Sequence, residues 1–127
     1  MSWTPEELAA IDAARELEIA VPRADDSVRP WTPIWAVCAD SEVYVRTWYR
    51  RETGWFGDAV RGERARVRVP GVEVGVRIED IGAGTTELRD AVDDAYRAKY
   101  GDGGSTSRMV GDDAAAATLR LVRVSGQ

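Results

Sequence analysis

Residues 31–56 read WTPIWAVCADSEVYVRTWYRRETGWF and contain the pattern that decides the fold. Two short apolar runs, 35–38 and 43–46, are joined through Asp40-Ser41, a connection tight enough to make them an antiparallel hairpin. The same segment holds four of the five tryptophans and several arginines, a combination that suits a flat, anionic ligand. These aromatics are equally typical of a small β core whose outer face is solvated by the arginines.

Alternating patterns elsewhere extend this hairpin to a larger sheet. Residues 65–69 alternate alanine or valine with arginine, and Pro70-Gly71 forms a turn to a second alternating run. The arginines of residues 64–68 share one face, which we interpret as the solvated side of a one-sided sheet. The final apolar run follows a long excursion, so we expect it to return and pair inside the sheet. The predicted strands cover residues 17–21, 34–38, 43–47, 65–69, 72–81 and 118–124.

Three segments have helical patterns, at residues 5–14, 54–61 and 86–100. Thr4 and Glu7 can form a capping box around Pro5 at the first helical position. In residues 86–100 apolar side chains recur at the spacing of one helix face, and Asp93 falls on the polar face. The glycine-rich residues 101–107 fit a mobile loop or a lid, and we favour the loop. The pattern of elements therefore predicts a single domain that spans residues 1–127. We expect this domain to be mainly β, a closed or nearly closed six-stranded antiparallel barrel with about three peripheral helices.

Charge and composition exclude several classes of protein. The chain carries a formal net charge of −5, which argues against general binding of nucleic acid or of a membrane surface. No apolar run approaches the length of a membrane-spanning helix, and the sequence begins without a signal-peptide pattern. Because Cys38 is also the only cysteine, we expect a cytoplasmic protein.

The sequence contains no histidine, which excludes Ser-His-Asp and Cys-His catalysis and nearly all zinc sites. Acidic pairs such as Asp93-Asp94 lack the spacing of a calcium-binding loop, so no metal site is predicted. If the protein is an enzyme, we expect a bound cofactor to carry the chemistry. Cys38 lies on a predicted strand with no histidine to activate it, and we interpret it as a structural thiol.

Several short blocks occur in an order and spacing that are fairly specific to one bacterial family. They are Trp3-Thr4 with Glu7-Leu8, Leu17-Glu18-Ile19, Ile34-Trp35, Tyr44-Val45-Arg46-Thr47, Trp55-Phe56, residues 95–101 (AYRAKYG) and residues 118–121 (TLRL). Spread over nearly the whole chain, these blocks resemble the bacterial domain of unknown function 2255 family. Where that family has a serine after Tyr-Val-Arg, this chain has Thr47.

The central pattern is also similar, more remotely, to the deazaflavin-dependent nitroreductases and other flavin-binding split barrels. As in those proteins, an Arg-x-x-Pro-like segment, here Arg29-Pro30-Trp31-Thr32-Pro33, precedes the hairpin, and an aromatic pair then begins a helix. The resemblance implies a split β-barrel that binds FMN or a deazaflavin as a homodimer, with the cofactor near the subunit boundary. It implies the following site: Arg29 and Arg46 pairing with cofactor phosphate, Thr47 donating a hydrogen bond, and Tyr44, Trp48 or Trp55 lining the ring.

Two hypotheses follow, and neither names a catalytic residue. The first is a flavin- or deazaflavin-dependent oxidoreductase of unknown substrate, and the second is a non-catalytic split barrel that binds a small molecule or a protein partner. Because Arg46 alternates with Val43 and Val45, core packing of the valines would place Arg46 and Tyr44 on the opposite face. We expect that face to be the pocket, and an alanine at position 46 to weaken ligand binding while changing folding little.

Overall fold

The protein is represented by a computed structural model that describes residues 3–22, 27, 30–46, 54–82, 84–101 and 103–124, apart from the side chains of residues 54, 55, 105, 108 and 113. Its strands are β1 (Leu17–Ala20), β2 (Thr32–Ile34), β3 (Ala36–Ala39), β4 (Glu42–Arg46), β5 (Arg64–Val69), β6 (Val72–Gly82) and β7 (Thr118–Arg123). Its helices are α1 (Pro5–Ala13), α2 (Gly54–Gly62), α3 (Thr86–Tyr100), α4 (Gly104–Met109) and α5 (Asp112–Ala115).

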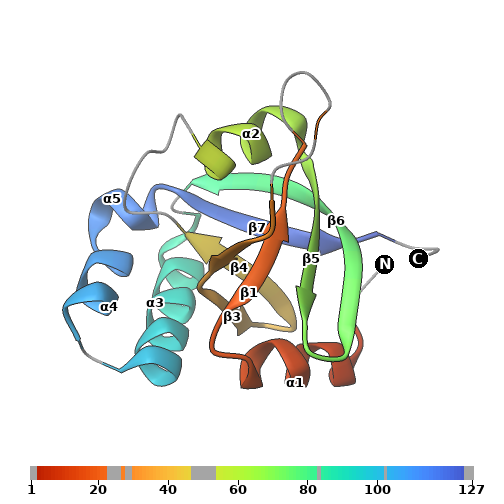
Figure 1. Ribbon diagram of the computed structural model, residues 1–127. Coiled ribbons are helices and arrows are strands. Elements are labelled where there is room, and N and C mark those ends of the chain that lie inside the picture. The colour runs from red at the N-terminus through yellow and green to blue at the C-terminus, as the bar shows by residue number, and fades with distance from the viewer. Residues whose placement is uncertain are drawn as a thin grey trace.

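All the strands form one antiparallel sheet in the order β2-β1-β5-β6-β7-β4-β3. The two outermost strands, β2 and β3, follow each other along the chain and are separated only by Trp35. The two edges of the sheet therefore come together at this residue, and the sheet curls into a nearly closed barrel (Figure 1). The predicted mainly β barrel is confirmed, with seven strands rather than six, because the chain bends at Trp35 and divides the expected strand 34–38 into β2 and β3.

Strand alternation decides which side chains fill the barrel. Val43 and Val45 of β4 and Leu119 and Leu121 of β7 lie inside it and are completely buried. The last strand pairs with both β6 and β4, so its predicted return into the middle of the sheet is confirmed. Helix α1 covers one end of the barrel, α2 lies at the other end, and α3, α4 and α5 cover one side (Figure 1).

A second buried cluster lies outside the barrel, between its wall and the covering helices. It consists of Val37, Tyr44, Val92, Tyr96 and Met109, contributed by β3, β4, α3 and α4. The glycine-rich segment 101–107 was expected to be a loop, but α4 begins within it at Gly104, and α5 follows. Their glycine-rich sequence lacks helical periodicity, and these short helices are stabilised by tertiary burial, for example of Met109.

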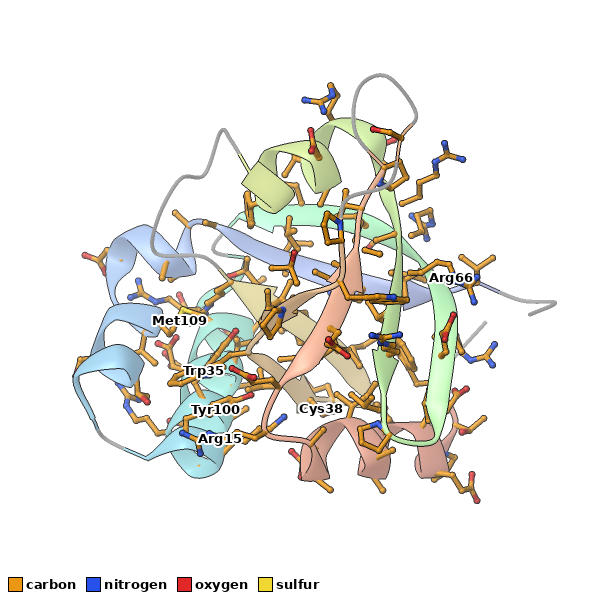
Figure 2. The ribbon with its side chains drawn as sticks, in the orientation of Figure 1. Arg15, Trp35, Cys38, Arg66, Tyr100 and Met109 are labelled. Atoms are coloured by element: carbon orange, nitrogen blue, oxygen red, sulfur yellow. The ribbon has the colours of Figure 1, made fainter. Side chains whose placement is uncertain are left out.

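The bend at Trp35 would leave backbone groups without partners if helix α3 did not reach it. Lys99 Nζ donates to the carbonyl oxygens of Ile11 (2.9 Å) and Ala36 (2.7 Å). Tyr100 Oη accepts from the Ala36 N–H (3.3 Å) and donates to the Arg15 carbonyl (2.8 Å), while its ring stacks on Trp35 at 3.9 Å (Figure 2). The block 95–101 therefore connects α3 to α1 and to the bend. It also provides hydrogen-bond partners for backbone N–H and C=O groups that have none within the sheet.

Candidate functional site

Arg46 is the last residue of β4 and is 2% exposed, although it carries a charge. Its Nε donates to Thr118 Oγ1 on β7 (2.8 Å), and its Nη1 donates to Asp93 Oδ1 on α3 (2.5 Å) and to the Met109 carbonyl on α4 (2.9 Å). The guanidinium carbon lies 5.7 Å from the ring centre of Tyr96. The strand alternation that directs Val45 inward thus directs Arg46 outward, into the layer between the barrel and its helices.

The ion pair between Arg46 and Asp93 continues towards the surface. Asp93 Oδ2 lies 3.5 Å from Arg89 Nε, one helical turn earlier on α3, and Arg89 Nη2 donates to Asp112 Oδ1 (2.8 Å) at the start of α5. The hydrogen bond to Asp112 raises the pKa of Arg89. The network therefore attaches the α4–α5 segment to α3 and, through Arg46, to the barrel wall.

One donor of this network is unused. Arg46 Nη2 is completely buried and has no hydrogen-bond partner among the described residues. A buried donor left unpaired costs about 1–3 kcal/mol, so such groups are rare, and ordered water, an ion, local strain or a functional role accounts for them. This amino group makes Arg46 the strongest candidate for contact with a ligand in the described part of the chain.

The structure places only two of the six predicted site residues completely. Tyr44 and Arg46 lie on the same outward face of β4, as the alternation predicted, and Tyr44 Oη accepts from Arg120 Nε (3.4 Å). This face is not the open pocket that we expected: α3 and α4 cover it, and Tyr44 is as deeply buried as Arg46. Arg29, Thr47, Trp48 and the side chain of Trp55 lie outside the described residues.

Sequence reasoning missed the partners of Arg46. Asp93 was expected on the polar face of its helix, which is wrong, since it is 7% exposed. A signal was present: Asp93 precedes Tyr96 by three residues, and such residues are neighbours on a helix surface. Burial raises the pKa of Tyr96, so this phenol stays neutral and its Oη donates to the Trp35 carbonyl (3.4 Å).

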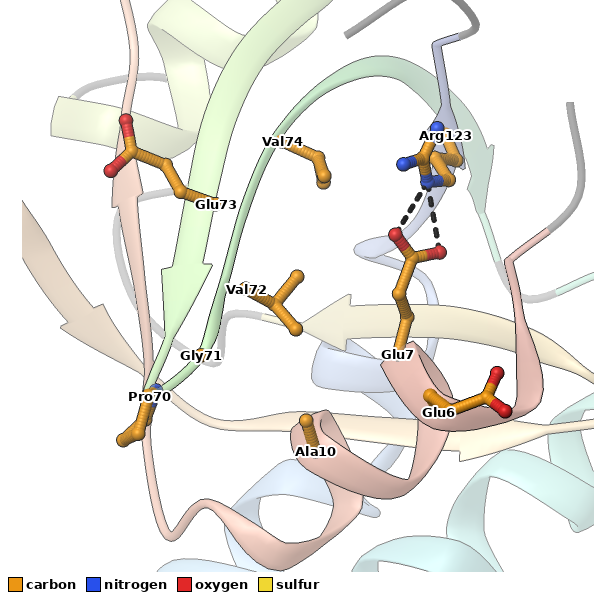
Figure 3. A pocket seen from close by; sticks show the side chains of 9 residues that line it. All are labelled: Glu6, Glu7, Ala10, Pro70, Gly71, Val72, Glu73, Val74 and Arg123. Carbon is orange, nitrogen blue, oxygen red and sulfur yellow. Dashed lines mark hydrogen bonds and ion pairs between the residues drawn. The ribbon is translucent and has the colours of Figure 1, made fainter.

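A separate cavity of about 440 Å³ lies between α1 and the turn that joins β5 to β6 (Figure 3). Its lining includes Glu6, Glu7, Glu73 and Arg123 together with apolar residues such as Val72. Arg123 Nε is 2.8 Å from both carboxylate oxygens of Glu7, so its charge is already balanced. With carboxylates in excess, this cavity does not favour a phosphate group.

Cys38 is a partly buried thiol whose Sγ lies 3.7 Å from the Leu8 carbonyl. Burial, helped by Asp12 and opposed by Lys99, raises the pKa of Cys38 to about 11. The folded protein holds the thiol proton more tightly than the unfolded chain does. The contribution of this protonated thiol to the stability of the fold is therefore present at neutral pH and is lost as the pH rises towards about 11.

We therefore expect thiol reagents to label the native protein slowly at neutral pH, and the thiolate absorbance to appear only near pH 11. The urea-unfolded protein is the control, and it should react quickly and titrate at the ordinary value for cysteine. Equal labelling rates for the native and unfolded protein at neutral pH would overturn the structural role of the thiol.

The strand order and the near closure of the antiparallel sheet define a split barrel, and similar folds occur among solved structures. The chain aligns over 98% of its length with an FAD-binding protein from Mesorhizobium loti (93% of that chain, 16% identity, TM-score 0.61). It aligns over 91% with a NimC/NimA family protein from Clostridium acetobutylicum (79% of that chain, 14% identity, TM-score 0.62). It also aligns over 99% with HutZ, the heme storage protein from Vibrio cholerae (93% of that chain, 9% identity, TM-score 0.73). At these identities the likeness establishes the fold alone.

Residues 7–121 match the family described as "Uncharacterized protein conserved in bacteria (DUF2255)", and the chain belongs to this family. The resemblance carried by blocks such as Tyr44-Val45-Arg46 and residues 95–101 is thereby confirmed. No curated protein matches the chain significantly. In the described part of the chain no helix is long and apolar enough to cross a membrane.

Proposed function

We propose that this protein binds a flavin-type cofactor, FMN or a deazaflavin, and acts as an oxidoreductase in the form of a homodimer. The observation that carries the proposal is the split-barrel fold, shared with a protein named as FAD-binding and with a NimC/NimA family protein. The lack of histidine is consistent with it, because the commonest general base is missing and a bound cofactor would carry the chemistry instead.

The residues of the network fit such a group in one respect. A flavin ring presents carbonyl oxygens along one edge, and the buried Nη2 of Arg46 is a donor that lacks an acceptor among the described residues. Arg46 and Tyr44 remain proposed cofactor contacts, although α3 and α4 cover both side chains, and Arg29, Thr47, Trp48 and Trp55 remain proposed contacts from the sequence. When bound, a flavin or deazaflavin supplies hydride transfer. The protein would orient the ring and exclude water from it.

A specific observation favours a second function, a non-catalytic split barrel that binds a small molecule or a protein. Arg46 is already neutralised by Asp93, and the described cavity has an excess of carboxylates, so neither resembles a ready phosphate site. The same fold occurs in a protein named for heme storage, and a fold by itself does not specify a reaction.

The absorbance spectrum of the freshly purified protein separates these two functions. The oxidoreductase proposal expects visible flavin-type absorption, or uptake of added FMN, FAD or deazaflavin with a Kd of about 1 μM or tighter, measured by fluorescence quenching after dialysis. Urea-unfolded protein serves as the control for non-specific uptake. A colourless protein that takes up none of these cofactors contradicts the proposal and favours the non-catalytic barrel. Light scattering on the same sample tests the homodimer.

A further inference from the structure

The outer face of β6 carries a charge pattern that is its own complement. Glu73, Gly75 and Arg77 alternate along this face, while the buried Val74 and Val76 point into the barrel. The side chains of Glu73 and Arg77 are 50% and 57% exposed. In the described part of the chain the helices lie at the two ends of the barrel and on the side of α3, so none of them covers the middle of β6 (Figure 1).

The neighbouring strands extend this pattern on both sides of its midpoint. Opposite Glu73 on β5 lies Arg68, which pairs with Glu18 on β1 at 2.9 Å, so this row of the sheet holds two carboxylates and one arginine. Opposite Arg77 lies Arg64, so that row holds two arginines. The face is therefore more acidic towards the turn that joins β5 to β6 and more basic towards its far end.

The basic end keeps an excess of positive charge although it contains a carboxylate. Glu79 lies 2.8 Å from Arg77 and 3.0 Å from Arg120, so one carboxylate serves two arginines. A carboxylate supplied by another molecule would therefore be attracted to this end of the face, and a guanidinium to the other end.

Gly75 is the midpoint of the pattern, and its own backbone does not require a glycine. Its φ lies outside the left-handed region, and a Cβ there would meet Arg66 Nη1 at 3.8 Å, an ordinary van der Waals distance. Glycine weakens the interior of a strand, and it often marks a bulge or the close approach of another backbone. The register of β6 with β5 is regular at Gly75, and the shift in its register with β7 lies at residues 80–82. The close approach of another molecule therefore accounts for this glycine.

We propose that the homodimer of the proposed function, on which this inference rests, forms through the outer face of β6 with its two-fold axis at Gly75. A two-fold interface must be self-complementary. Rotation about this axis reverses β6 and brings Glu73 of each copy opposite Arg77 of the other, each contact about 7 Å along the strand from the axis. The exposed Val124, whose N–H donates to the Gly75 carbonyl at 3.1 Å, lies beside the centre and loses its contact with water.

Complementary charge reversals test this interface. We would prepare Arg77→Glu and Glu73→Arg and measure the molar mass of each by sedimentation equilibrium. Each substitution places like charges at both symmetry-related contacts, so we expect each variant alone to dimerise about tenfold more weakly or worse. An equimolar mixture of the two variants restores opposite charges at both contacts, and we expect it to dimerise as the parent protein does.

Two further variants complete the experiment. Arg97→Glu reverses a charge on α3 that is 48% exposed, and it should leave the dimer unchanged. Gly75→Gln adds a side chain that the fold accommodates but that stands between the two copies, so it should weaken the dimer as well. The melting temperature of each variant is compared with that of the parent, because exposed ion pairs contribute little to folding. If a charge variant does not fold, Gly75→Gln answers the question alone.

Three outcomes overturn the interface, and they are distinguishable from failure of the proposed function. A parent dimer that the charge reversals or Gly75→Gln leave unchanged uses another face. Weakening by both charge reversals without recovery in the mixture contradicts the pairing of Glu73 with Arg77, and a different partner then fits this face. A monomeric parent protein overturns the homodimer and the interface together. Flavin uptake by the same sample is measured independently of its mass, so the cofactor part of the proposed function is tested separately.

Discussion

Replacing Arg46 by alanine is expected to destabilise the folded protein by about 3–5 kcal/mol. The variant leaves the Asp93 carboxylate, 7% exposed, without its closest counter-charge and leaves the Met109 carbonyl without its donor. Urea unfolding of the apo protein measures the effect. This expectation reverses the one drawn from the sequence, where a surface arginine on a strand should tolerate alanine; burial is what makes the difference.

Two further variants identify the cause of that loss. Arg66→Ala removes an exposed arginine whose contact with Glu73 is 3.5 Å long, and it should change the stability by no more than about 0.5 kcal/mol. Arg46→Ala combined with Asp93→Ala should be more stable than Arg46→Ala alone, because the double variant no longer buries an unpaired charge. A loss below about 1 kcal/mol for Arg46→Ala would show that the ion pair does not hold α3 and α4 on the barrel.

Replacing Lys99 by methionine is expected to cost about 1.5–3 kcal/mol, the usual range for hydrogen bonds from a charged group. Methionine keeps the apolar stem but removes the ammonium group that donates to the carbonyls of Ile11 and Ala36. Of these two carbonyls, that of Ala36 keeps a second donor from α3, Tyr100 Oη at 3.3 Å. The Ile11 carbonyl belongs to the last turn of α1, which has no basic residue of its own. The free energy of unfolding in urea measures the loss.

Arg97→Met is the matched control for Lys99→Met. It lies on the same helix, is 48% exposed, and contacts Asp94 at 3.4 Å, so its replacement should change the stability by no more than about 0.5 kcal/mol. Equal effects of the two substitutions would mean that Lys99 contributes only helix propensity and surface charge, and that the bend at Trp35 does not depend on its ammonium group.

Local pattern was enough to predict most of the elements. Alternation in residues 65–69 and 118–124 predicted β5 and β7 within a residue or so, and the capping pattern at Thr4 and Glu7 is present as predicted at the start of α1. These features depend on contacts between residues close in sequence. They also follow the side-chain repeat of a strand, two residues, or of a helix, 3.6 residues, and both repeats are visible in the sequence itself. The same reasoning correctly placed the side chains of β4. Val43 and Val45 point into the barrel, whereas Tyr44 and Arg46 point out of it.

The sequence by itself thus determined most of the strands, the three longer helices, the barrel class and the face on which Arg46 lies. Only the tertiary structure decided what covers that face. Asp93 and Met109 reach Arg46 from positions 47 and 63 residues away in the chain, and no local period reports contacts of that range. The bend at Trp35 is likewise set by α3, through Lys99 and Tyr100, rather than by a turn signal in its own sequence. A charged side chain that local reasoning places in solvent is buried here because a distant helix supplies its counter-charge.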